Sequence, residues 1–101
     1  MKKPFAVKRE DLVTFCRRHH IRRLSLFGST LKGSDHAGSD VDLLVEFDPE
    51  HVPGLIRLEG MAQELSGLLE GRDVDLVTPR FFRPALRNRI AREAEVLYAR
   101  A

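Results

Sequence analysis

The chain has 101 residues, of which 43% are hydrophobic and 32% are charged, and its formal net charge at pH 7 is +2. A chain of this length builds one core, so we expect a single domain over residues 1–101. No apolar stretch approaches the roughly 20 residues that cross a membrane, and no signal peptide is recognisable, so we expect a cytoplasmic protein without membrane association. The net charge is too small to indicate nucleic-acid binding.

The first half of the chain predicts one helix and two strands. Residues 7–19 predict an amphipathic helix, because four side chains recur at helical spacing: Leu12, Phe15, Cys16 and His19. Cys16 is the only cysteine, which excludes an internal disulfide, and its place on this face predicts a core thiol. Residues 22–28 and 41–47 read as strands, the second mostly buried. The turn after the first strand suits a short helix at "TLKG".

The second half predicts helix, strand and helix. Pro53 opens a helix that Gly71 closes, and its apolar stripe consists of Leu55, Leu58, Ala62, Leu65 and Leu69. Residues 73–78 form a short third strand, stopped by Pro79. A last helix begins at Pro84 and runs to 99, with three side chains facing inward: Leu86, Ile90 and Leu97. Its end, "EVLY" at 95–98, is equally compatible with a short strand.

This alternation predicts an α/β (α+β) fold of the order αβαβαβα, with a small sheet flanked by helices. The connection between the first two strands is only about a dozen residues, so that pair can be antiparallel and we expect a mixed sheet.

Carboxylates interrupt the two later strands. Asp40 and Asp42 are two residues apart, so an extended chain projects both from one face. Two ionised carboxylates side by side are costly to bury, and divalent cations remove the conflict. A pair of hard cations about 3.5–4 Å apart is the usual arrangement for phosphoryl transfer. If the second and third strands are neighbours, Asp75 lies opposite this pair and can complete one metal's shell and orient or deprotonate an attacking hydroxyl. Asp73, at the start of its strand, is expected in solvent.

A Gly-Ser turn supplies a second half of the predicted site. Gly28 permits close approach, the Ser29 hydroxyl can donate to a phosphate oxygen, and backbone N–H groups at a helix start bind phosphate. Lys32 can add positive charge. A Gly-Ser turn or one Asp-x-Asp alone is more often an ordinary turn or cap. Ten residues separate Ser29 from Asp40, and with the later aspartate the combination indicates a metal–nucleotide site.

Other polar residues leave alternatives open. The arginine-rich stretches 17–23 and 80–92 fit a solvated surface, or contact with an acidic partner or a phosphate-bearing ligand. Phe81 and Phe82 fit either core closure or a partner interface. His36 lies in the loop and can touch a ligand, whereas three histidines are expected on the surface: His19, His20 and His51.

At these residues the chain resembles the minimal nucleotidyltransferases (MNT, or MntA-like proteins) of the DNA polymerase beta-like superfamily. The resemblance rests on "LSLFGS", "SDVDLLVEFDP", "GRDVDLVTP" and "LRNRIAREAEVLYA" and covers nearly the whole chain. Related proteins often carry arginine where this chain has Thr30 and Lys32.

The resemblance implies the nucleotidyltransferase fold, ATP as substrate and two Mg²⁺ ions, with Mn²⁺ as the alternative. Gly28 and Ser29 would hold the β- and γ-phosphates, with Lys32 nearby, and three aspartates would ligate metal: Asp40, Asp42 and Asp75. Family members act as antitoxins to a HEPN-domain toxin, which allows a hetero-oligomer, and for some the proposed reaction is transfer of AMP to a tyrosine of that toxin. The alternative is a non-catalytic module that neutralises the toxin by binding, with a vestigial nucleotide site. A transferase acting on nucleic acid is a distant third.

Overall fold

Four strands form one mixed sheet in the computed structural model, which describes residues 7–27 and 41–100, except for the side chain of Phe81. The strands are β1 (Ile21–Leu26), β2 (Val41–Phe47), β3 (Val74–Val77) and β4 (Glu95–Ala99), in the spatial order β3-β2-β1-β4. β1 pairs antiparallel with both β2 and β4, and β2 pairs parallel with β3. The predicted α/β (α+β) class, mixed sheet and antiparallel first pair are confirmed.

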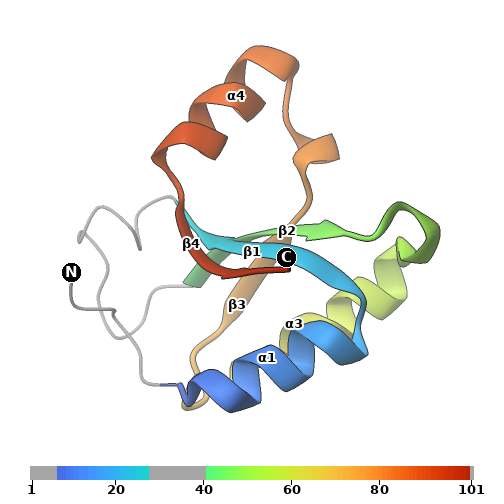
Figure 1. Ribbon diagram of the computed structural model, residues 1–101, viewed down its shortest axis with the longest axis vertical. Coiled ribbons are helices and arrows are strands. Elements are labelled where there is room, and N and C mark those ends of the chain that lie inside the picture. The colour runs from blue at the N-terminus through green and yellow to red at the C-terminus, as the bar shows by residue number, and fades with distance from the viewer. Residues whose placement is uncertain (1–6, 28–40, 101) are drawn as a thin grey trace.

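Helices lie on both sides of this sheet (Figure 1). α1 (Arg9–Arg18) and α3 (Leu55–Leu68) pack together beneath one face, whereas α4 (Pro84–Glu93) rises on the other side. Two short 3₁₀ turns are also found among the described residues: η1 (Pro49–His51) follows β2, and η2 (Pro79–Phe81) connects β3 to α4. None of the helices found in the described ranges is long and apolar enough to cross a membrane.

The hydrophobic core lies between the sheet and the α1–α3 layer. Alternate strand residues point into it, and we call this side of the sheet the core face: Leu24, Leu26, Val41, Leu43, Val45 and Leu76. From the helices it receives Phe15, Cys16 and Leu65, all at most 1% exposed. The core thiol predicted for Cys16 is confirmed, and burial raises its pKa to about 12.

The predicted start of α3 is two residues early. Gly54 is the N-cap, and Leu55, expected on the buried stripe, is 74% exposed. At the other end α3 stops at Leu68, three residues before Gly71. Glu70, directly after the C-cap Leu69, adopts φ +60°, and Gly71 adopts φ +79° and donates its N–H to the carbonyl of Ser66, which closes the helix.

The last predicted helix is too long. It ends at Glu93, and residues 95–99 form β4 against β1, so the alternative of a strand at "EVLY" is confirmed. The inward orientation predicted for Leu86 is wrong, because this side chain is 45% exposed and α4 buries no residue. Leu97 is buried as expected, but as a strand residue. Pairing with the buried strand β1 outweighs the helical pattern of this short segment.

Candidate active site

Asp42 and Asp75 occupy paired positions on neighbouring strands. The register of the parallel pair places Val41 opposite Val74 and Asp42 opposite Asp75, and the Val41 N–H donates to the Asp73 carbonyl at 2.8 Å. Paired residues in a sheet project to the same face, on strands about 4.8 Å apart. The sequence-based expectation that Asp75 lies opposite the first carboxylate pair depended on this neighbourhood of strands, which is confirmed. Asp42 is half-buried and Asp75 is exposed.

The orientation of Asp42 follows from its neighbours. Val41 and Leu43 are completely buried on the core face, at 0% and 1% exposure. Because side chains alternate along a strand, these two residues force Asp42 onto the opposite face. The residues that share this side include several polar ones, and we call it the polar face: Arg23, Ser25, Asp42, Glu46 and Asp75.

The described residues on either side of segment 28–40 lie beside Asp42. The N–H of Phe27, the last described residue after β1, donates to the Asp42 carbonyl at 3.1 Å, and Val41 is the first residue of β2. Six of the residues singled out in the sequence lie within this segment and outside the described residues, as does the short helix expected at "TLKG": Gly28, Ser29, Thr30, Lys32, His36 and Asp40.

The described part of the site offers oxygen ligands. Carboxylates are the ligands that hard cations such as Mg²⁺ and Mn²⁺ prefer, so Asp42 and Asp75 fit the metals implied by the resemblance. No cluster of three metal-ligating side chains occurs among the described residues. The two carboxylates therefore account for part of the predicted ligand set of three, and Asp40 is its remaining member.

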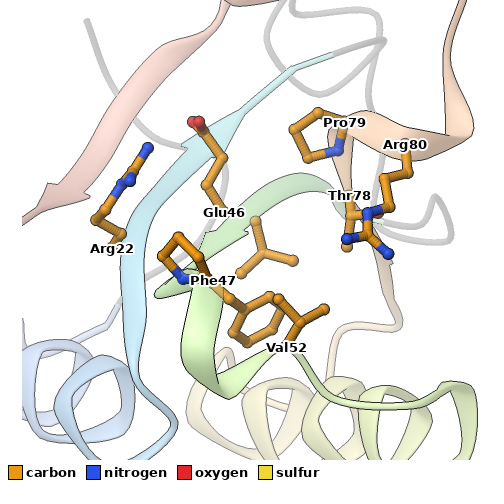
Figure 2. A pocket seen from close by; sticks show the side chains of 9 residues that line it. Arg22, Glu46, Phe47, Val52, Thr78, Pro79 and Arg80 are labelled. Atoms are coloured by element: carbon orange, nitrogen blue, oxygen red, sulfur yellow. The ribbon is translucent and has the colours of Figure 1, made fainter.

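A cavity of about 260 Å³ lies at the other end of β2, beside Glu46 and Phe47 (Figure 2). Glu46 is four residues beyond Asp42, which along a strand is about 13 Å. Arg22 and Arg80, one from each arginine-rich stretch of the sequence, line it together with apolar side chains. No pattern along the chain indicates this cavity, because its lining comes from β1, β2 and the segment after β3, which are far apart in sequence.

Three histidines were expected on the surface, and two lie there. His20 and His51 are exposed and stack on each other, with ring centroids 3.8 Å apart. His19 is different: only 14% of its side chain is exposed, and its Nε2 lies 3.1 Å from Glu64 Oε1. Burial, followed by the positive charges of Arg18 and Arg57, lowers the pKa of His19 below its usual range.

Phe82 packs close to the end of β1. Its ring meets that of Phe27 edge to face, with centroids 6.0 Å apart, and both side chains are half-buried. This contact favours core closure over a free interface for Phe82. The side chain of Phe81 lies outside the described part of the chain.

Comparison with known proteins agrees with this geometry. The family model described as "Nucleotidyltransferase domain" matches residues 9–97. The chain is 33% identical over 89 residues to MJ0435 of Methanocaldococcus jannaschii, whose name proposes a protein adenylyltransferase; the match covers 87% of this chain and 90% of that protein. It is 34% identical to the protein adenylyltransferase MntA of Thermococcus cleftensis, over 75% of this chain and 74% of that one.

A solved structure shows the same arrangement of strands and helices. It is a crystal structure of a toxin–antitoxin with AMP-PNP, one chain of which superimposes with a TM-score of 0.72 at 25% identity, over 93% of this chain and 75% of that chain. With the paired aspartates on β2 and β3 and the family match over nearly its whole length, the chain belongs to the nucleotidyltransferase domain family.

Proposed function

We propose that this chain is a metal-dependent adenylyltransferase that transfers AMP from ATP to a hydroxyl, a tyrosine hydroxyl in particular, of a partner HEPN toxin, and that it thereby acts as an antitoxin. The observation that carries the proposal is the pairing of Asp42 with Asp75 on one face of two parallel strands. The relatives named as protein adenylyltransferases, and the toxin–antitoxin neighbour with AMP-PNP, support the substrate and the class of partner.

The residues of the predicted site divide into a phosphate-binding group and a metal-binding group. Gly28 and Ser29 bind the β- and γ-phosphates of ATP, and Lys32 adds positive charge beside them. Three carboxylates hold the two Mg²⁺ or Mn²⁺ ions: Asp40, Asp42 and Asp75. When bound, the metals neutralise the phosphate charge and that of the leaving pyrophosphate.

The chemical step is an in-line displacement at the α-phosphorus. The oxygen of the acceptor hydroxyl forms a bond to this phosphorus, and the bond from the α-phosphorus to the bridging oxygen of the β-phosphate breaks, so pyrophosphate leaves. The hydroxyl proton passes to a carboxylate oxygen of Asp75, the exposed member of the pair. The half-buried Asp42 contributes a ligand whose direction is fixed by the buried residues on either side of it.

The surroundings of the pair favour a macromolecular acceptor. After β3 the chain forms η2, α4 and β4, and β4 returns to the same sheet. None of these described elements forms a second lobe over Asp75 that would enclose a small acceptor. An acceptor protein has its own folded surface and can supply the missing contacts, in a hetero-oligomer of toxin and antitoxin.

The test is the intact mass of a HEPN toxin encoded beside this chain, after incubation with the chain, ATP and Mg²⁺. We expect a gain of whole AMP units, and peptide digestion would locate the modified residue. An unchanged mass together with a stable complex on a sizing column would contradict the transferase and support the non-catalytic binding module.

A further inference from the structure

β3 is an outer strand of the sheet, and its second edge pairs with no strand in the described part of the chain. The Val41 N–H donates to the Asp73 carbonyl. In a parallel ladder alternate residues bond to the same neighbour, so the backbone groups of Asp73 and Asp75 face β2. The N–H and C=O groups of Val74 and Leu76 consequently point away from β2, toward the outer edge.

A groove follows this edge between β3 and α3. It consists of two adjoining cavities of about 340 and 310 Å³ that share Glu59, Ala62 and Val74. Leu55 and Leu58 from α3 line one end, beside Asp75 and Val77. We call this the β3 groove. Leu55 and its neighbour Ile56 are 74% and 91% exposed, an unusual amount of large apolar surface at the start of a helix.

The β3 groove is acidic, whereas the chain as a whole has a small positive charge. The ionisable side chains that line it among the described residues are carboxylates, Glu59, Asp73 and Asp75, and no described lysine, arginine or histidine lines either cavity. The chain as a whole carries a formal charge of +2. An acidic, partly apolar groove beside open backbone groups is complementary to an extended segment with basic and apolar residues.

A second copy of the chain is a poor occupant for the same reason. Pairing β3 with another β3 brings Asp73 and Asp75 of both copies close together, and like charges on adjacent strands are destabilising. The carboxylates of Asp73 and Asp75 therefore favour a basic strand over a second copy of β3 at this edge.

We propose that the outer edge of β3 binds a basic, extended segment of the acceptor protein as an additional strand, and that this pairing presents the acceptor hydroxyl to Asp75. The inference rests on the proposed transferase function and specifies how its protein substrate is held. In an added strand about 4.8 Å from β3, the residue opposite Asp75 projects from the polar face. A long side chain such as tyrosine can then reach across Asp75 toward Asp42, which lies one strand further in.

Amide hydrogen exchange by NMR tests this pairing directly. The full ¹⁵N-labelled chain is measured alone and with a purified HEPN toxin, without ATP. We expect exchange to slow at least about tenfold at Val74 and Leu76, whose N–H groups face outward, because hydrogen-bonded amides exchange only on opening. Amides of β4, the other outer strand of the described sheet, serve as the internal control and should be unchanged.

The intact mass of the toxin, measured after ATP and Mg²⁺ are added to the same sample, separates the two proposals. AMP transfer with protection at Val74 and Leu76 supports both. AMP transfer without that protection overturns strand addition and leaves the transferase standing. Protection without AMP transfer supports the docking edge and contradicts the transferase, and the absence of both contradicts both.

A matched pair of charge reversals gives an independent test. Glu59→Lys changes the β3 groove, whereas Glu50→Lys makes the same change at an exposed residue of η1 outside it. We expect Glu59→Lys to lower kcat/KM for the toxin about tenfold at low salt, through KM, and Glu50→Lys to stay within about twofold. Equal effects of the two variants, or none from Glu59→Lys, would overturn the docking edge.

Discussion

The two faces of the sheet differ in what they bury and in what covers them. The core face carries only apolar side chains, all buried beneath α1 and α3. The polar face carries Asp42, Glu46 and Asp75, and the helix on its side, α4, buries none of its residues. The side chains of β2 alternate between the two faces, and the buried Leu44 adds one apolar residue to the side of Asp42 and Glu46. The same strand therefore anchors the fold with one set of side chains and carries the proposed chemistry with the other.

This division predicts that activity and stability can be lost separately. Packing on the core face holds β2 in place whichever polar residues it displays on the other side. Substitutions on the polar face should change catalysis while the free energy of unfolding stays nearly constant, and substitutions on the core face should do the reverse. The predictions below test this separation.

The largest effect is expected for Asp42→Asn. The change keeps the shape of the side chain and removes the charge that a metal ligand needs, so we expect AMP transfer to fall on the order of a thousandfold. Glu46→Gln is the matched control, because Glu46 lies on the same strand and the same face, four residues away. Its rate should stay within a few-fold.

Circular dichroism and urea unfolding of both variants would show whether the fold is kept. We expect each to remain within about 1 kcal/mol of the parent in unfolding free energy. Equal loss of activity in the two variants would contradict the assignment of the site to the Asp42 end of β2.

Much of this fold follows from local patterns in the sequence. The mostly apolar run "VDLLVEF" predicts a buried strand, and the apolar spacing around Phe15 and Leu65 predicts the two helices that cover the core face. The last segment was less certain. "EVLY" fits a helix and a strand alike. It forms a strand because the edge of β1 that does not pair with β2 accepts it, and no local pattern contains this tertiary feature.

The candidate site could be predicted only in part for a related reason. The spacing of Asp40 and Asp42 predicts that both project from one face of a strand. The position of Asp75 depends on which strands are neighbours, and the parallel pairing of β2 with β3 determines it. The β3 groove and the cavity beside Glu46 are formed by residues far apart in sequence. Neither leaves a motif along the chain, so neither was predicted.

The next largest effect concerns the helices on the two sides. Leu65 in α3 is 0% exposed, and Leu65→Ala should lower the unfolding free energy by about 2–5 kcal/mol, because it leaves a cavity in the core. Leu86→Ala in α4 is the same substitution at an exposed position and should cost less than about 0.5 kcal/mol. Urea denaturation measures both. A large loss for Leu86→Ala would mean that α4 packs more tightly than its exposure indicates.

A smaller effect is expected at the connection of α4 to the sheet. The Arg87 guanidinium donates to the carbonyls of Pro79 (3.0 Å) and Phe82 (3.1 Å), and so ties α4 to η2. Arg87→Ala should cost about 1 kcal/mol. Arg89 lies on the same helix and, within the described part of the chain, pairs with the exposed Glu93, so Arg89→Ala should cost about 0.3–0.5 kcal/mol or less. The reverse order in thermal or urea unfolding would show that η2 does not hold the helix.

The smallest expected effect is a pH dependence of stability that comes from His19, on the core-face side of the sheet. His19 packs its ring against Phe15 with centroids 4.7 Å apart, and its Nε2–H donates to Glu64, which also pairs with Arg18. The other ring nitrogen, Nδ1, is buried and has no hydrogen-bond partner among the described residues, so a proton placed there has no acceptor. This agrees with a pKa below the usual range, caused first by burial and then by the neighbouring arginines.

The sign of the pH effect follows from that lowered pKa. Above about pH 6.5 His19 is neutral in both the folded and the unfolded chain, and the stability is fully present. As the pH falls below this value, His19 becomes protonated in the unfolded chain while it stays neutral in the folded chain. The unfolding free energy therefore decreases until the pH reaches the pKa of His19 in the folded chain. His19→Gln should flatten this decrease between pH 7 and 5, measured by urea denaturation at several pH values. An unchanged slope in the variant would place the titrating group elsewhere and show that the α1–α3 layer tolerates a charged His19.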